Sequence, residues 1–224
     1  MNGKERFPAP SGLLTSSPTI PASKSRLVTS SPTIRHPGHL PRLAPEFYRG
    51  DAAVHWTLTV FDRGSGWLNA AFHSAFRELM HHTAAREGLF CPAYCLMPDH
   101  IHLLWLGLRR DTDQRNGMSF LRSHLERQLC PHKFQPQAHD HVLRDEERKH
   151  GAFAKICFYI LANPVRAGLM RETEIWPYGG AIIPGYPTLE PWQDDFWPKF
   201  WKLFQQTRQP DAGERKLPFR SSHQ

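Results

Sequence analysis

Two histidines in an apolar run are the first residues that could support chemistry. The segment CLMPDHIHLLWLGL, residues 95–108, contains His100 and His102. Successive side chains of a strand point to opposite faces, so the two histidines share one face while Ile101 and Leu103 point into the core on the other. Two neutral imidazoles on a rigid strand can chelate one divalent cation. The alternative is a pair of half-exposed strand histidines without a ligand role.

A second pair with the same spacing provides an internal comparison. His139 and His141 stand in QAHDHVL, among polar and charged residues. The first pair instead interrupts an apolar strand, where an unpartnered polar group is costly. We therefore assign a metal role to the first pair only. The histidine-triad nucleotide hydrolases need H-x-H-x-H, and Leu104 at the third position argues against that chemistry.

A tyrosine in an apolar helical segment is the candidate nucleophile. In KICFYILANPVRAGL, Tyr159 and Asn163 are four residues apart and share one helical face. Pro164 must end or kink the helix, which puts Asn163 at its terminus. Phenols ionise only near pH ~10, so a tyrosine is a poor nucleophile at neutral pH unless a cation assists it. The alternative is a core aromatic residue capped by an asparagine.

The hydrophobic periodicity predicts the elements that hold these residues. Alternation predicts strands at 53–61, 90–96 and 101–108, and a short strand within the polar stretch at 134–149. Apolar residues at three- and four-residue spacing predict helices from about 66 to 86, from 118 to 129 and from 152 to 163, the first stopped by Gly88. The order β-α-β-β-α-β-α fits an α+β fold, a ferredoxin-like antiparallel sheet with helices packed on one face.

The length of 224 residues suits one well-buried domain with tails. Residues 1–45 are rich in Pro, Ser and Thr and repeat TSSPTI, which predicts a disordered basic tail. This tail is either a passive leader or an arm with weak affinity for phosphate backbones. We expect residues 46–188 to form the catalytic domain and 189–224 a C-terminal aromatic helix and tail.

The C-terminal segment PWQDDFWPKFWKLFQQ places Phe196, Phe200 and Phe204 at helical spacing. Such a stripe is usually a packing face. The alternative is a surface on which unpaired bases stack, with Trp201 as the residue to test.

The charge balance narrows the class of partner. Lys and Arg number 28 against 21 Asp and Glu, a net charge of +7, which favours a polyanion such as nucleic acid or a membrane surface. No window approaches the ~18 apolar residues that span a bilayer, and the N-terminus lacks a secretory signal, so we expect a cytoplasmic protein with no membrane partner. The four cysteines match no zinc spacing and are expected to be small, reduced core residues. The candidates for phosphate contacts are Arg109, Arg110, Arg122, Arg127, Arg144 and Arg166.

Together these segments resemble one family, the REP-associated tyrosine transposases, which are single-tyrosine members of the HUH endonuclease superfamily of the IS200-like transposase type. The motifs are FYRGDAAVHWTL at 47–58, YCLMPDHIHLLW at 94–105, HVLRDEE at 141–147 and YILANPVRAGL at 159–169. They span roughly residues 42–185 in the expected order. One departure is WPYGGA at 176–181, where Gly179 and Gly180 replace the serines of the family's W-x-Y-S-S segment.

The resemblance implies a site and a reaction. His100 and His102 would be metal ligands, Asn163 the third ligand, and Tyr159 the nucleophile of a 5′-phosphotyrosine intermediate. The cofactor would be a divalent metal, Mg²⁺ or Mn²⁺, with Mn²⁺ suiting a mixed nitrogen and oxygen site best. The partner would be single-stranded or hairpin DNA of the REP palindrome type.

The expected function is therefore that of a metal-dependent single-stranded DNA endonuclease and strand transferase, associated with the nucleoid. Two alternatives stay open. One is a domesticated REP-hairpin-binding protein with idle chemistry, and the other is a metal hydrolase acting on nucleotides without a covalent adduct. The protein could be a monomer or a homodimer, which decides whether the tyrosine and the histidines come from the same chain.

Overall fold

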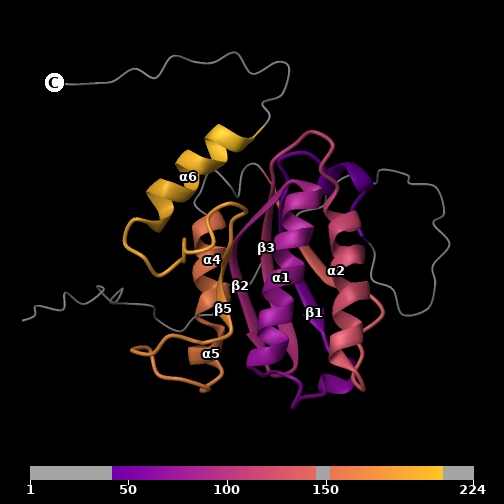
Figure 1. The fold of residues 1–224 in the computed structure, drawn as a ribbon. Helices are drawn as coiled ribbons and strands as arrows, with labels where there is room; N and C mark the ends of the chain where they lie inside the picture. Colours follow the sequence, from indigo (N-terminus) through magenta and orange to yellow (C-terminus); the bar gives the residue numbers. More distant parts are fainter. Residues whose placement is uncertain (1–41, 145–151, 209–224) are drawn as a thin grey trace, which may run out of the picture. The chain divides into compact units, whose positions relative to one another are not determined.

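The computed structural model describes residues 42–144 and 152–208 (Figure 1). Its strands are β1 (Ala53–Thr59), β2 (Leu89–Met97), β3 (His100–Gly107), β4 (His139–Leu143) and β5 (Gly179–Ile182), and its α-helices are α1 (Ala70–Glu87), α2 (Gln114–Leu129), α4 (Ala152–Leu161), α5 (Asn163–Arg166) and α6 (Phe196–Thr207). Short 3-10 helices span Pro45–Tyr48 and Phe61–Arg63. Most of the predicted tail at 1–45, the end of the HVLRDEE motif and the last sixteen residues lie outside the described residues.

The strands form one antiparallel sheet in the order β4-β1-β3-β2-β5. The first four follow the chain order β1-α1-β2-β3-α2-β4, which is the ferredoxin-like arrangement. The predicted α+β class is therefore confirmed. Strand β5 was not predicted, because its sequence GGAI offers little strand preference and its pairing with β2 supplies the stability that propensity does not.

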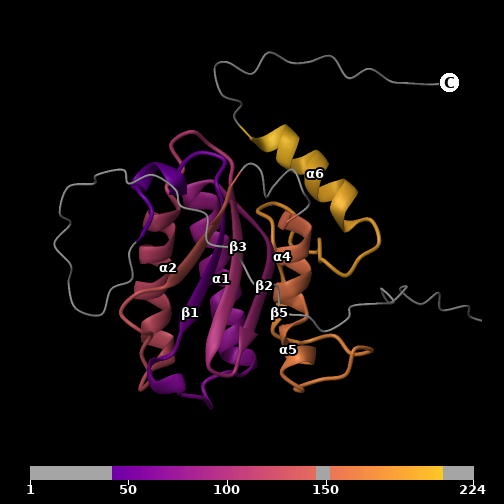
Figure 2. The same cartoon turned by 180° about the vertical axis from the view of Figure 1, so that it is seen from behind.

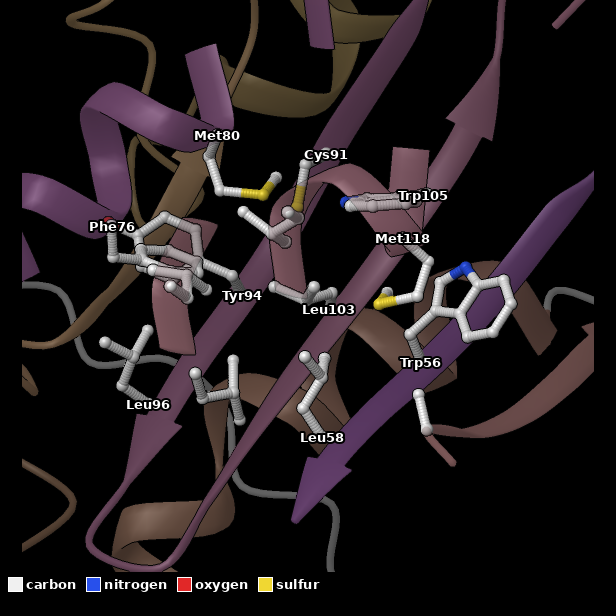
Figure 3. Packing of buried hydrophobic residues seen from close by; sticks show 14 of the residues in the cluster. Trp56, Leu58, Phe76, Met80, Cys91, Tyr94, Leu96, Leu103, Trp105 and Met118 are labelled. Carbon is white, nitrogen blue, oxygen red and sulfur yellow. The ribbon is translucent and has the colours of Figure 1, made fainter. Parts of the chain in front are cut away.

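Helices α1 and α2 cover one face of the sheet (Figure 1). The core between them contains Trp56, Leu103 and Trp105 from the strands and Phe76 from α1, all fully buried (Figure 3). Leu121 of α2 is fully buried in the same core. Asn69 caps α1 by accepting a hydrogen bond from the backbone of the third helical residue, and Gly88 ends the helix in the left-handed conformation.

The sequence predicted helices on one face of the sheet, but the structure has helices on both faces. Helices α4 and α6 pack on the opposite face, seen from behind in Figure 2, in a second core with Phe90, Leu104 and Leu106 of the sheet. The physical reason is that β2 and β3 are buried on both sides, so each face needs its own cover.

Helix α6 contributes a packing face to this second core. Phe196 and Phe200 are fully buried there and Phe204 nearly so, which confirms the packing interpretation of the phenylalanine stripe. Trp201 is 39% exposed, with its ring 5.2 Å from that of Phe153. The base-stacking hypothesis therefore applies to Trp201 and not to the phenylalanines.

The burial of the cysteines tests the prediction that they are small core residues. Cys91, Cys95 and Cys157 are buried and Cys130 is exposed, so the prediction of core cysteines holds for three of the four. All four are free thiols. Within the described ranges, no helix is both long and apolar enough to cross a membrane.

The structure explains Gly180, one of the two glycines that replace serines of the family pattern. Gly180 has φ +154°, and a Cβ atom there would lie 2.7 Å from a Glu190 carboxylate oxygen and 3.1 Å from the Tyr94 hydroxyl. The same carboxylate accepts a hydrogen bond of 3.2 Å from the Ala181 backbone N–H and pairs with Arg77 at 3.4 Å. The missing side chain thus makes room for the polar network that fastens β5.

Gly180→Ala is expected to lower the free energy of unfolding by roughly 1–3 kcal/mol, because it adds both backbone strain and a clash. Urea unfolding measures the loss. Gly185→Ala is the matched control, since Gly185 also has positive φ, +84°, but nothing lies within 4 Å of its Cβ position. Equal losses of unfolding free energy in the two variants would show that the effect comes from backbone strain alone. A Gly180→Ala variant as stable as the wild type would contradict the role of the network.

Candidate metal and nucleophile site

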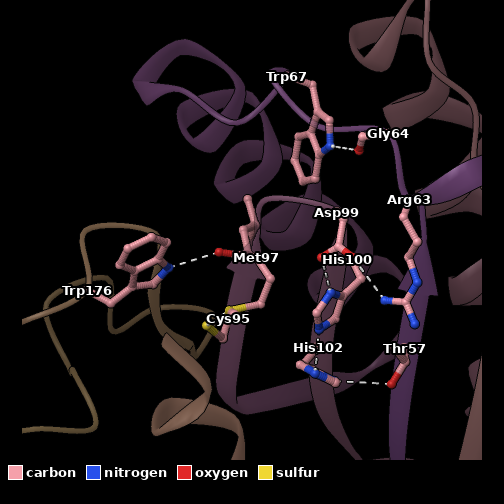
Figure 4. A network of polar contacts seen from close by, with 11 residues as sticks. Thr57, Arg63, Gly64, Trp67, Cys95, Met97, Asp99, His100, His102 and Trp176 are labelled. Carbon is pink, nitrogen blue, oxygen red and sulfur yellow. Dashed lines mark hydrogen bonds and ion pairs between the residues drawn. The ribbon is translucent and has the colours of Figure 1, made fainter. Parts of the chain in front are cut away.

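The two histidines of β3 face each other at the start of the strand. A two-residue turn of Pro98 and Asp99 joins β2 to β3, so His100 is the first residue of the strand. His100 and His102 lie on the face that carries α4, with Nε2 atoms 3.0 Å apart (Figure 4). His102 is only 7% exposed. The predicted alternation thus places both imidazoles on one face.

Asp99 orients the first histidine. Its carboxylate lies 2.6 Å from His100 Nδ1 and 3.0 Å from Arg63 Nη1 (Figure 4). Burial alone would raise the Asp99 pKa, but the hydrogen bond with His100 and the ion pair with Arg63 outweigh it, and the pKa is lowered. A carboxylate behind an imidazole is a common way to orient a metal-binding histidine.

Strand β1 supplies two neighbours to the second histidine. His102 Nδ1 lies 3.1 Å from the Thr57 hydroxyl and 3.1 Å from His55 Nε2. Thr57 is the direct partner of His102 in the β1–β3 register. Burial, with the charges of the neighbouring histidines, lowers the pKa of His102 to about 3 and that of His55 to about 4. Both imidazoles are therefore neutral at neutral pH and keep a lone pair.

No pattern in the sequence singles out His55. It alternates with the buried Val54 and Trp56, as a polar member of a half-buried strand does. Its contact with His102 depends on the register between β1 and β3, which the sequence does not specify.

The second histidine pair lies on the neighbouring edge strand. In the β1–β4 register His141 is opposite His55 and His139 is opposite Thr57, so all these side chains share one face of the sheet. After burial, the charges of His141 and His139 are the causes that lower the His55 pKa. Both residues of the pair are exposed, as the polar context predicted.

Helix α4 brings Tyr159 to the same place. The Tyr159 ring centroid lies 6.1 Å from that of His102 and 6.2 Å from that of His55, and the side chain is 43% exposed. The Arg166 guanidinium lies over the tyrosine ring, 4.5 Å from its centroid. The Tyr159 phenol, the His55 and His102 imidazoles and the Arg166 guanidinium therefore converge on one place. They come from three separate parts of the chain.

Asn163 is the first residue of α5 and follows the end of α4 by two residues. Its amide nitrogen donates hydrogen bonds to the carbonyl oxygens of Tyr159, at 2.9 Å, and Ile160, at 3.3 Å. These bonds satisfy carbonyl groups at the end of the helix, which explains an asparagine before Pro164. They use the nitrogen of the amide, and the ligand role of its oxygen stays a prediction.

The residues present fit a divalent cation. Two ligands at right angles around an ion with bonds of about 2.1 Å are about 3 Å apart, which matches the 3.0 Å between the two Nε2 atoms. Among the residues that the structure describes, no group of three or more His, Cys, Asp or Glu side chains is arranged to hold an ion. The other ligands would have to be amide, water or substrate oxygens, a donor set that suits Mn²⁺.

The predicted arginines are dispersed, and Arg122 and Arg109 bind to groups within the fold. The Arg122 side chain is 17% exposed and donates to the carbonyl oxygens of Gln135 and Pro136. Arg109 donates to the Arg86 carbonyl and pairs with Asp111. The structure places Arg110, Arg127 and Arg144 at exposed positions. Of the six, Arg166 is the one that contacts the candidate nucleophile.

Two half-buried histidines predict how stability depends on pH. His55 and His73 have folded pKa values of about 4, lowered mainly by burial, against ~6.5 in an unfolded chain. As the pH falls the unfolded chain takes up protons first, so this stability is present above pH ~6.5 and is lost towards pH ~4. Urea unfolding of metal-free protein in this range is expected to show a falling free energy. A flat profile would contradict the burial of these imidazoles as neutral groups.

Comparisons with known proteins agree with this fold. No family model matches the chain. A curated protein of Haemophilus influenzae named "Putative REP-associated tyrosine transposase" is 26% identical over 138 residues, which cover 55% of this chain and 76% of that protein. A solved REP-associated tyrosine transposase bound to a REP hairpin has a similar fold, with a TM-score of 0.53, 18% identity, and 63% of this chain and 81% of that chain covered. The predicted resemblance to the REP-associated tyrosine transposases is thereby confirmed.

Proposed function

We propose that the protein cleaves and rejoins single-stranded DNA at a hairpin of the REP type, through covalent attack by Tyr159. The observation that carries this proposal is the convergence of Tyr159 with His102 and His55, at ring distances of 6.1 and 6.2 Å, on the face that also holds His100. A core aromatic residue would be buried, whereas Tyr159 is half-exposed beside a polar cluster.

The chain's own residues supply the nucleophile and the binding groups. The Tyr159 oxygen forms a bond to phosphorus, the bond from phosphorus to the 3′ oxygen breaks, and the phenol's proton ends on the released 3′ hydroxyl. Arg166, whose guanidinium lies over the phenol ring, would supply the positive charge that holds the phosphate in line with the attack. The DNA 5′ end stays on Tyr159 as a phosphotyrosine.

His100 and His102 would hold the divalent cation through their Nε2 atoms, with Asn163 as the proposed oxygen ligand. The bound cation would stabilise the negative charge that develops on the phosphate oxygens. Asp99 and Thr57 keep the two imidazoles oriented toward it. Because the phosphoester is kept in the covalent intermediate, a second 3′ hydroxyl can displace Tyr159 and rejoin the strand without ATP.

The choice of DNA rests on the relatives and on charge. The structural relative is a transposase bound to a REP hairpin, and the net charge of +7 suits a polyanion. Strand transfer on REP-type palindromes is therefore the activity we propose for this chain, with Arg110, Arg127 and Arg144 as further phosphate contacts.

The direct test is to incubate the protein with labelled REP-type hairpin DNA and Mn²⁺ or Mg²⁺, and to look for a denaturation-resistant complex. The proposal expects a complex that requires the cation. Binding without any such complex would favour a hairpin-binding protein with idle chemistry. Release of cleaved DNA without a covalent complex would favour a plain metal hydrolase.

A further inference from the structure

His55 is a polar residue at the site that the proposed reaction does not use directly. Its Nε2 atom and the Thr57 hydroxyl both lie 3.1 Å from Nδ1 of His102, and the other nitrogen of His102 faces His100 at 3.0 Å. Each nitrogen of the His102 ring is thus occupied by a polar neighbour. The hydrogen bonds that these neighbours allow decide which ring nitrogen carries the proton.

The tautomer of His100 is fixed by its neighbour. The Asp99 carboxylate lies 2.6 Å from His100 Nδ1 and pairs with Arg63 at 3.0 Å, so it accepts a hydrogen bond from His100 Nδ1. Nδ1 of His100 therefore carries a proton. In a neutral imidazole this leaves the lone pair on Nε2, pointing at His102.

The tautomer of His102 is not fixed in the same way. With a proton on its Nε2, His102 can donate to His100 Nε2, and its Nδ1 then accepts from the Thr57 hydroxyl. With a proton on its Nδ1, it donates to Thr57 or His55, and both Nε2 lone pairs face the same point. Only the second arrangement can bind a cation between the rings.

A hydroxyl both donates and accepts, so Thr57 supports either tautomer of His102. His55 differs from Thr57 because an imidazole that is protonated at Nδ1 cannot donate from Nε2. In that form its Nε2 atom, 3.1 Å from His102 Nδ1, can only accept a hydrogen bond from His102.

We propose that His55, itself protonated at Nδ1, is a positioning residue that holds His102 in the tautomer with Nδ1 protonated, so that the Nε2 atoms of His100 and His102 are both free for one divalent cation. This inference rests on the metal site of the proposed function. It adds a residue that neither the resemblance nor the sequence singled out. Its proton balance is neutral, because the His102 proton moves from Nε2 to Nδ1 and none is released.

The test is a titration of the full-length chain with Mn²⁺ alone, without DNA, followed by calorimetry or electron paramagnetic resonance. His55→Leu is expected to weaken Mn²⁺ binding about 10- to 100-fold, the usual cost of losing a group that orients a metal ligand. His55→Gln keeps an acceptor near the Nε2 position and is expected to restore most of the affinity. His141→Leu, directly opposite on β4, is the matched control and should bind as the wild type does.

The second readout is the ring tautomer itself. Long-range proton–nitrogen spectra of the metal-free wild type are expected to show His102 protonated at Nδ1 only, and those of metal-free His55→Leu a mixture of tautomers. If His55→Leu does not fold, His55→Asn replaces it, because that shorter side chain stays polar but does not reach His102.

The outcomes separate the inference from the proposed function. Wild-type Mn²⁺ affinity in His55→Leu, or in His55→Asn if that variant is used, would overturn the inference and leave the DNA chemistry standing. A wild type that shows the expected metal affinities but forms no covalent complex with hairpin DNA would overturn the proposed chemistry alone. A wild-type chain that does not bind Mn²⁺ or Mg²⁺ would overturn both.

Discussion

Tyr159→Phe is expected to abolish the covalent complex with hairpin DNA, with a loss of about 10³-fold or more in strand cleavage. The change removes one oxygen atom, which is the atom proposed to bond to phosphorus. The ring stays in place, so its contacts with His55, His102 and Arg166 are kept. Hairpin binding and thermal stability should therefore be unchanged, which separates a chemical loss from a structural one.

Tyr186→Phe is the matched control for this prediction, because Tyr186 is 47% exposed and thus similar in exposure to Tyr159. It should form the complex at the wild-type rate. A complex that persists in Tyr159→Phe would refute the assignment of the nucleophile. A complex lost equally in both variants would point to a general defect in DNA binding.

The double variant His100→Ala/His102→Ala is expected to lose cleavage by roughly 10²- to 10⁴-fold, since a bound cation supplies several kcal/mol of charge stabilisation in phosphoryl transfer. Mn²⁺ binding in the absence of DNA should be lost as well. Single-turnover cleavage of labelled hairpin and a Mn²⁺ titration measure the two effects.

The double variant His139→Ala/His141→Ala is the built-in control, because it removes a pair with the same spacing from the same face of the sheet. It should keep cleavage and Mn²⁺ binding. Equal losses in the two double variants would show that the strip of histidines acts as a whole and would contradict the assignment of a single pair.

The sequence was informative where one pattern decides one element. The period of two in β3 placed His100 and His102 on a common face, and Gly88 ended α1 as expected. Pro164 indicated a helix end near Asn163, and α4 ends two residues earlier, at Leu161. These are local properties, so they could be predicted from one chain.

The remaining features depend on contacts between distant segments. His55 reaches His102 only through the register of β1 with β3, and β5 forms only because β2 offers an edge for pairing. In the sequence Arg122 is a candidate for a phosphate contact. In the structure its guanidinium instead donates hydrogen bonds to carbonyl groups of the loop before β4. No periodicity in the chain contains this information.

The most direct measurement of the central claim is peptide mapping of the covalent complex. Trypsin cleaves after Lys155 and Arg166, which isolates ICFYILANPVR, a peptide whose one phenol is Tyr159. After nuclease digestion, mass spectrometry should find the residual nucleotide on this peptide, joined through phosphate to the tyrosine. A nucleotide found on a different peptide, or cleaved hairpin with all peptides unmodified, would contradict the account.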